Sequence, residues 1–118
     1  MPIADAPILE VYYAAYCEPC RRELPVLAKL EAETNFVIVV LGDRDKGCAQ
    51  VLAASPAFVD KVQVSPTGND REILRKAGDK DGILPYARTI RQDGSLCASW
   101  RGILTEVRIH DMLKTCRE

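Results

Sequence analysis

Apolar stretches alternate with amphipathic stretches along the first half of the chain. The segment Ile8–Ala14 is rich in β-branched and aromatic residues, which favour a strand. Phe36–Leu41 is a continuous apolar run, typical of a strand that is buried on both faces of a parallel sheet. Residues 18–33 carry leucines at helical spacing with charged residues between them. This pattern predicts a strand, a helix and a second strand parallel to the first.

The second half of the pattern predicts shorter elements. An Asp93-Gly94 pair between two extended segments is a hairpin signal, and Thr105 is a suitable N-cap for a final amphipathic helix. The expected elements are a helix over 45–54, an extended segment over 61–64, a turn over 65–68, a helix over 70–77 closed by Gly78, strands over 86–91 and 95–101, and a helix over 105–116. The whole order predicts one α/β domain over residues 1–118, with a central mixed sheet flanked by helices on both faces.

Composition and charge narrow the class of protein. Of the 118 residues 47% are hydrophobic, which is enough for one core, and the net charge of -1 gives no basic surface for nucleic acid. No apolar run reaches the roughly 18–20 residues that span a membrane. Residues 1–7 have neither the basic nor the apolar part of a signal peptide. We therefore expect either a cytoplasmic protein or an exported domain without its leader.

The pair Cys17 and Cys20 follows a predicted buried strand and opens a predicted helix. Residues three apart in a first helical turn are close enough for a disulfide, and a helix N-terminus stabilises a thiolate. Cys17 is then the nucleophile, and Cys20 is the thiol that resolves a mixed disulfide. Pro19 fits the first turn because its missing N–H would have no partner there.

Two other interpretations of this pair are weaker. A zinc site needs two more ligands, but the sole histidine, His110, lies on the last predicted helix and there is no second Cys-x-x-Cys. The second interpretation is that Cys17 and Cys20 are two unreactive cysteines of the core. Thiol–disulfide chemistry needs neither a metal nor an organic cofactor, so we expect none.

Three further cysteines, Cys48, Cys97 and Cys116, bring the total to an odd number of five. At least one thiol therefore stays unpaired within a monomer. Cys48 lies on the apolar side of its predicted helix and is expected to act as a small buried hydrophobe. Cys97 lies on a hairpin strand that the last helix could cover, so a second disulfide from Cys97 to Cys116 is an alternative to two free thiols.

The sequence AYCEPCRRELP over residues 15–25 resembles the active-site segment of thioredoxin-like proteins of the TlpA/ResA class. The resemblance spans nearly the whole chain, through the sequence GILP at 82–85, where the family carries a cis-proline, the Asp-Gly hairpin at 93–94 and the entry to the last helix at 102–106. Residues 64–66 and 84–87 also resemble MauD, the thioredoxin-like accessory protein of methylamine dehydrogenase maturation. The resemblance implies a thioredoxin fold.

The resemblance also implies roles for residues around the cysteine pair. Pro85 is expected to follow a cis peptide bond and to bring the backbone of the preceding residue beside the pair, where it can bind an extended substrate segment. Glu23, one turn past Cys20, is expected to carry the proton of that thiol, the alternative being a solvated helix charge. A mainly apolar groove for protein substrates is expected, formed by Tyr16, Glu18, Pro19 and Leu84 together with Pro85.

Three departures separate the chain from its relatives. Tyr16 replaces the usual tryptophan before the first cysteine, and Leu84 stands before Pro85 where many relatives have threonine or valine. Val11 occupies the place where cytosolic thioredoxin carries a buried acid, so ordinary thioredoxin is the poorer match.

By this resemblance the protein is an enzyme, a protein disulfide oxidoreductase. It would be a specialised reductant outside the cytoplasm that keeps the cysteines of cytochrome c or metalloprotein clients reduced. A membrane thiol carrier would recharge it. One alternative is a MauD-like oxidase or isomerase that acts on one client. Another is a thioredoxin-fold binding module whose cysteines are idle. Nothing in the sequence signals an oligomer, so a monomer is expected.

Overall fold

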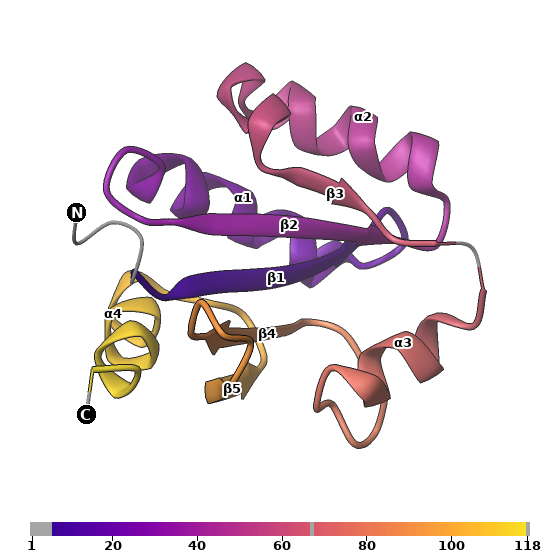
Figure 1. The fold of residues 1–118 in the computed structure, drawn as a ribbon. Coiled ribbons are helices and arrows are strands. Elements are labelled where there is room, and N and C mark those ends of the chain that lie inside the picture. The colour runs from indigo at the N-terminus through magenta and orange to yellow at the C-terminus, as the bar shows by residue number, and fades with distance from the viewer. Residues whose placement is uncertain (1–5, 67, 118) are drawn as a thin grey trace.

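A five-stranded sheet runs through the middle of the molecule (Figure 1). The computed structural model describes residues 6–66 and 68–117, so part of the turn predicted over 65–68 and the N-terminal segment 1–5 lie outside the described residues. Apart from the short 3-10 helix η2 (Pro56–Asp60), which lies between α2 and β3, the elements follow the predicted order. They are β1 (Ile8–Ala14), α1 (Glu18–Leu30), β2 (Phe36–Leu41), α2 (Arg44–Ala54), β3 (Val62–Val64), α3 (Asp70–Lys76), β4 (Tyr86–Ile90), β5 (Leu96–Arg101) and α4 (Glu106–Thr115).

The sheet is mixed, as the sequence predicted, with strand order β3-β2-β1-β4-β5. β1, β2 and β3 are parallel, whereas β4 pairs antiparallel with both β1 and β5. Parallel pairing brings the carboxyl ends of β1 and β2 to one edge of the sheet. Tyr12, near the end of β1, lies opposite Tyr86, the first residue of β4. The loop before β4 therefore reaches the same edge as the start of α1.

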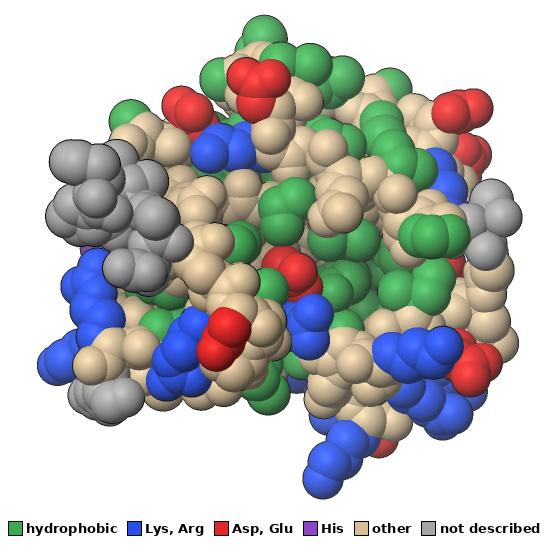
Figure 2. Space-filling view, in the orientation of Figure 1, with side chains coloured by type: hydrophobic (Ala, Val, Ile, Leu, Met, Phe, Trp, Pro, Cys, Tyr) green, Lys and Arg blue, Asp and Glu red, His purple; other side chains and the backbone are tan. Residues whose placement is uncertain are grey.

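Helices lie on both faces of the sheet, but they cover them unequally. On one face, the Tyr13 hydroxyl donates to Gln50 Oε1 of α2 (2.6 Å), and the Thr89 hydroxyl donates to a carbonyl of α4 (2.9 Å). α1 lies on this face too (Figure 1). On the other face, the Tyr86 hydroxyl donates to the Ala77 carbonyl at the end of α3 (2.9 Å). Figure 2 shows this less covered face, where hydrophobic side chains lie in a hollow with acidic and basic side chains among them.

Two local features differ from the sequence-based expectation. α1 ends at Leu30 rather than at Glu33, because the N–H groups of Glu33 and Thr34 both bond back to the Leu30 carbonyl (3.1 and 3.0 Å). The helix η2 was not predicted. It buries Phe58 edge-on against the ring of Phe36, at 5.6 Å between centroids, and this contact is visible only in three dimensions.

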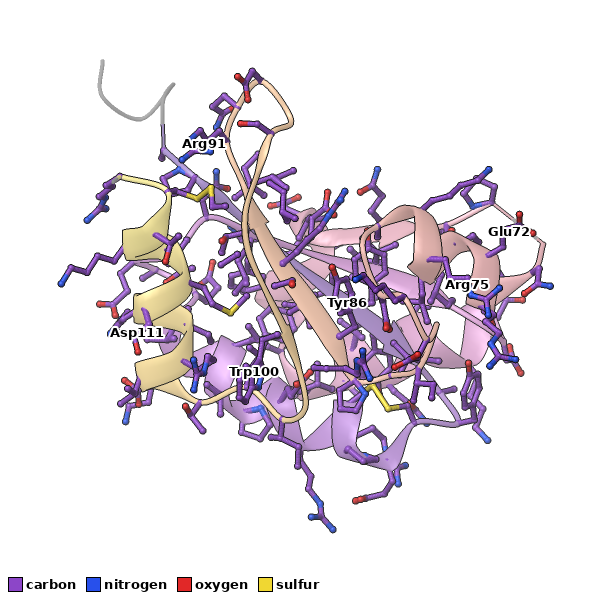
Figure 3. The ribbon with its side chains drawn as sticks, turned by 90° about the horizontal axis from the view of Figure 1, so that it is seen from below. Glu72, Arg75, Tyr86, Arg91, Trp100 and Asp111 are labelled. Carbon is purple, nitrogen blue, oxygen red and sulfur yellow. A yellow bond between two sulfur atoms is a disulfide. The ribbon has the colours of Figure 1, made fainter. Side chains whose placement is uncertain are left out.

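A second disulfide joins Cys97 to Cys116, with their Cα atoms 5.0 Å apart. The β4–β5 register shifts at this point, since Thr89 faces Ala98 but Ile90 faces Leu96. Cys97 is thus the extra residue of a β-bulge, a feature that changes the direction in which a side chain points. The bond fixes the C-terminal end of α4 to the hairpin. The two disulfides lie at opposite sides of the molecule (Figure 3).

We expect the double variant Cys97→Ala/Cys116→Ala to lose about 3 kcal/mol of unfolding free energy, because this disulfide closes a loop of 19 residues in the unfolded chain. Urea unfolding of the purified protein measures this loss. Cys48→Ala is the matched control, since Cys48 is half-buried and is the unpaired one among the described cysteines. Alkylation of the denatured, unreduced protein should label Cys48 alone. Labels on Cys97 and Cys116 as well would contradict the second disulfide.

Candidate active site

The cysteine pair lies where β1 turns into α1. The N–H of Cys17 bonds to the carbonyl of Ala14 (3.0 Å), so the chain leaves the strand through one tight turn. Cys17 is the N-cap of α1, and Pro19 occupies its first turn without loss of a hydrogen bond. Cys17 and Cys20 form a disulfide, with their Cα atoms 5.3 Å apart.

The surroundings of the two sulfur atoms differ. Cys17 Sγ accepts a hydrogen bond from the backbone N–H of Cys20 (3.2 Å), and the helix N-terminus adds positive potential. Both effects favour a thiolate once the disulfide is reduced. Cys17 retains 7% exposure, whereas Cys20 has none and its sulfur lies 3.8 Å from the Tyr12 carbonyl oxygen. An incoming sulfur can therefore reach Cys17 but not Cys20.

A groove of about 440 Å³ lies beside Cys17. One wall is formed by Tyr16, Glu18 and Pro19, and the other by the loop that leads to β4, with Gly82, Ile83 and Leu84. Of the residues that the sequence assigned to the groove, Tyr16, Glu18, Pro19 and Leu84 line it, whereas Pro85 does not. The sequence did not assign Gly82 and Ile83 to the groove. In the structure Ile83 is 53% exposed and lies next to Leu84. Glu18, which is ion-paired to the exposed Arg22, is the one charged residue in the lining.

The loop that carries the second wall is firmly held. The buried carboxylate of Asp79 accepts the N–H of Ile83 through Oδ2 (3.0 Å), and Arg101 contacts its Oδ1 (3.4 Å). Gly82 has a positive φ of 64°, and an added Cβ would lie 2.9 Å from the backbone oxygen of Arg71. The wall therefore exists before any substrate arrives.

The peptide bond from Leu84 to Pro85 is cis. Pro85 is half-buried and does not line the groove itself, and its carbonyl accepts the N–H of Gly102 (3.1 Å). Within the described part of the chain, the N–H and the carbonyl of Leu84 have no backbone hydrogen-bond partner. The backbone of Leu84 thus stays free beside the cysteine pair.

Glu23 is a buried acid rather than a solvated helix charge. It is 1% exposed and lies one turn past Cys20 on the same helix. Its Oε2 accepts the N–H of Leu104 (2.9 Å), while Oε1 has no hydrogen-bond partner among the described residues. Burial raises the pKa of Glu23 to about 7, although the hydrogen bond from Leu104 opposes the shift. Val11, at the position of the thioredoxin acid, is apolar and 1% exposed.

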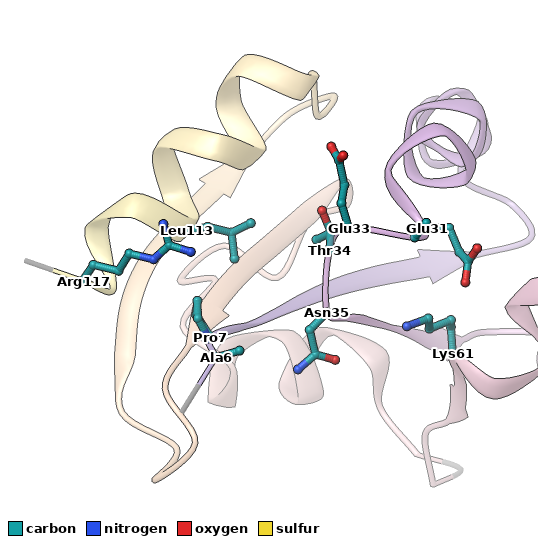
Figure 4. A pocket seen from close by; sticks show the side chains of 10 residues that line it. Ala6, Pro7, Glu31, Glu33, Thr34, Asn35, Lys61, Leu113 and Arg117 are labelled. Atoms are coloured by element: carbon teal, nitrogen blue, oxygen red, sulfur yellow. The ribbon is translucent and has the colours of Figure 1, made fainter. Parts of the chain in front are cut away.

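The other cavities are lined by side chains of a different kind. One of about 370 Å³ lies between the end of α4 and the turn after α1 (Figure 4), and its walls include Glu31, Lys61 and Arg117 but no cysteine. Across residues 6–66 and 68–117, no group of three or more His, Cys, Asp or Glu side chains could hold a metal ion. Of the helices described, none is long and apolar enough to cross a membrane. The cysteine-lined groove is therefore the candidate active site.

A prediction follows from the raised pKa of Glu23. Between pH 4.5 and about pH 7 the folded protein holds a proton that the unfolded chain releases, so stability falls as pH rises through this window. The loss should total about 3 kcal/mol, an order-of-magnitude figure. Glu23→Gln, whose side chain cannot titrate, should remove this dependence of the unfolding free energy on pH. Urea unfolding of the oxidised protein at several pH values measures it. Glu33→Gln, an exposed control, should keep it. An unchanged slope in Glu23→Gln would contradict the assignment.

Comparison with known proteins agrees with this geometry. No family model matches the sequence, and no curated protein matches it. Among solved structures, a thioredoxin-related protein from Neisseria meningitidis serogroup B has a TM-score of 0.75 at 19% identity, covering 96% of this chain and 86% of its own. A putative thiol:disulfide interchange protein DsbE from Chlorobium tepidum has a TM-score of 0.67 at 21% identity, covering 96% and 82%. The pneumococcal exposed lipoprotein thioredoxin from Streptococcus pneumoniae has a TM-score of 0.67 at 20% identity, covering 94% and 85%. The strand order, the cysteine pair and these neighbours together show that the chain has the thioredoxin fold.

Proposed function

We propose that the protein is a thiol–disulfide oxidoreductase that acts on the cysteines of other proteins. The observation that carries the proposal is the Cys17–Cys20 disulfide at the N-terminus of α1, with the reachable sulfur facing a preformed groove. A purely structural disulfide would gain nothing from a helix N-terminus that stabilises the thiolate of one partner. The thiol:disulfide interchange protein among the structural neighbours supports the same chemistry.

The reaction in the reducing direction has two steps. The Cys17 thiolate attacks one sulfur of a client disulfide, the client bond breaks, and the other client sulfur leaves as a thiolate. The Cys20 thiol then loses its proton and attacks Cys17 Sγ. The Cys17–Cys20 disulfide forms as the mixed disulfide between Cys17 and the client breaks, and the client leaves with both sulfurs reduced. Two electrons pass from the protein to the client, and the structure has the cysteine pair in its oxidised state.

Glu23 is proposed to take the proton of Cys20 in the second step. Its pKa near 7 allows it to accept and return a proton at neutral pH, and Oε1 is not engaged by another described residue. Glu23 would thus accept the proton of Cys20, which the apolar side chain of Val11 cannot do. Glu23→Gln should then also shift the apparent pKa of Cys20, and an unchanged thiol titration would remove Glu23 from the mechanism.

The client is proposed to be a protein segment in extended form. The free backbone N–H and carbonyl of Leu84 can pair with such a segment as a neighbouring strand would. The mainly apolar lining around Ile83 suits side chains next to the client cysteine better than it suits a small charged metabolite. Pro85 contributes no N–H that could compete for the Cys17 thiolate.

We further propose a reducing role outside the cytoplasm, with a membrane thiol carrier as electron donor. The Cys97–Cys116 disulfide supports an oxidising compartment, because such bonds persist there and are rare in the cytoplasm. A structural neighbour named as an exposed lipoprotein thioredoxin supports the same location. Clients of the cytochrome c or metalloprotein type remain part of this proposal, as does a monomeric state.

The enzymatic proposal is tested with the disulfides of insulin as a model client. The wild-type protein with dithiothreitol should reduce them, and Cys17→Ser should abolish the catalysed rate. Cys20→Ser should accumulate a mixed disulfide through Cys17, because no resolving thiol remains. Cys48→Ser is the matched control and should leave the rate unchanged. Equal rates for wild type and Cys17→Ser would instead favour a binding module with idle cysteines.

The direction of electron flow is tested by the reduction potential of the Cys17–Cys20 pair, measured by equilibration with glutathione or dithiothreitol buffers. We expect a value well below about -220 mV, as befits a reductant. A value near about -120 mV would contradict this and favour a MauD-like oxidase for a specific client. The Cys97→Ala/Cys116→Ala variant serves as a control that assigns the measured potential to the active-site pair.

A further inference from the structure

The Arg44 side chain binds three backbone carbonyls from two loops at the active-site edge of the sheet. Its Nη1 donates to Gly42 (2.6 Å), its Nε to Ser65 (2.7 Å) and its Nη2 to Pro66 (2.6 Å). The side chain is 15% exposed. A guanidinium presents its donors in a rigid planar fork, so these contacts fix the loops relative to each other.

Tyr16, the residue directly before the nucleophile Cys17, is supported at two points near Arg44. Its ring lies against Gly42, where an added Cβ would come within 2.8 Å of Tyr16 Cε2. Its hydroxyl lies near the carboxylate of Asp70, the first residue of α3. Burial first, and then the negative charge of nearby Asp70, raise the pKa of Tyr16.

Both supports of Tyr16 contact the same guanidinium, Gly42 through a hydrogen bond and Asp70 through an ion pair. Arg44 holds the Gly42 carbonyl, and its Nη2 lies 3.5 Å from Asp70 Oδ1. We propose that Arg44 is a positioning residue that holds Tyr16, through Gly42 and Asp70, as a fixed wall of the groove beside Cys17. This inference rests on the proposed function.

The consequence concerns docking rather than sulfur chemistry. Tyr16 is 68% exposed, and without its supports the ring would lose conformational freedom each time a client docked. A ring that is already fixed avoids that entropic cost. Among the described residues, the hydrogen bonds and the ion pair of Arg44 go to Gly42, Ser65, Pro66 and Asp70, and none goes to a sulfur of the pair. The intrinsic reactivity of the Cys17 thiolate should therefore be independent of Arg44. The docking of a protein client should depend on Arg44.

The first arm of the test is structural and needs no activity. The α protons of Gly42 lie beside the Tyr16 ring, so its ring current displaces their NMR shifts, and Tyr16→Ala gives the undisplaced values. Arg44→Gln should lose this displacement, which would show that Arg44 holds the ring. If the displacement persists in Arg44→Gln, the proposal is overturned, whether or not the protein reduces disulfides.

The second arm separates docking from reactivity. Arg44→Gln should lower kcat/KM for insulin reduction about fivefold, the equivalent of one ordinary hydrogen bond, through a higher KM. Alkylation of reduced Cys17 by iodoacetamide, followed by mass spectrometry, should keep its rate. Asp70→Asn should act in the same direction, and it leaves the three carbonyl contacts of Arg44 in place if Arg44→Gln folds poorly. Glu72→Gln, an exposed acid on the same helix, is the matched control and should change nothing.

A double-variant cycle decides whether the effect passes through Tyr16. In a Tyr16→Ala background, Arg44→Gln should have no further effect on KM. An equal loss in both backgrounds would overturn the proposal, because Arg44 would then act on the fold at large. If the wild-type protein reduces no protein disulfide, the proposed function fails, and the Gly42 shifts still decide whether Arg44 holds Tyr16.

Discussion

The parallel pairing of β1 with β2 is the constraint on which the rest of the site depends. It places the end of β1, the start of α1 and the β2–α2 loop at one edge of the sheet. The antiparallel pairing of β1 with β4 then brings the loop before Tyr86 to the same edge. A helix N-terminus, a free backbone segment and two groove walls meet there because of strand register. The two groove walls, one at the start of α1 and the other in the loop before β4, come from segments that are far apart along the chain.

Buried polar groups hold this edge in shape. Glu23 ties α1 to the segment before α4, and Arg44 joins the loops that follow β2 and β3. Asp79 braces the loop between α3 and β4 through Ile83 and contacts Arg101 at the end of β5. A buried charge without partners would be costly, so each of these groups specifies one arrangement of the chain around it. Glu23 differs from the other two, because one of its oxygens is left without a described partner. That oxygen is the one proposed to take the proton of Cys20.

The two disulfides lie at opposite sides of the molecule (Figure 3). Cys97 and Cys116 fix the end of α4, whose other end follows directly on Leu104, the donor to Glu23. The bond that is proposed to open and close in each cycle lies elsewhere, at the start of α1. The helix can thus stay anchored while the Cys17–Cys20 bond is broken.

The sequence by itself determined the order of the elements and the cysteine pair at a helix start, because these depend on local periodicity and spacing. Family resemblance led to the groove residues around Tyr16 and Leu84. It also led to the cis peptide bond before Pro85. Only the tertiary structure decided whether Glu23 is solvated or buried, since that depends on a backbone N–H 81 residues away in sequence. The bonding of Cys97 to Cys116 depended on a bulge, and the contacts of Arg44 on carbonyls from other loops. Such pairings carry no periodic signal, because strand register and loop closure set them.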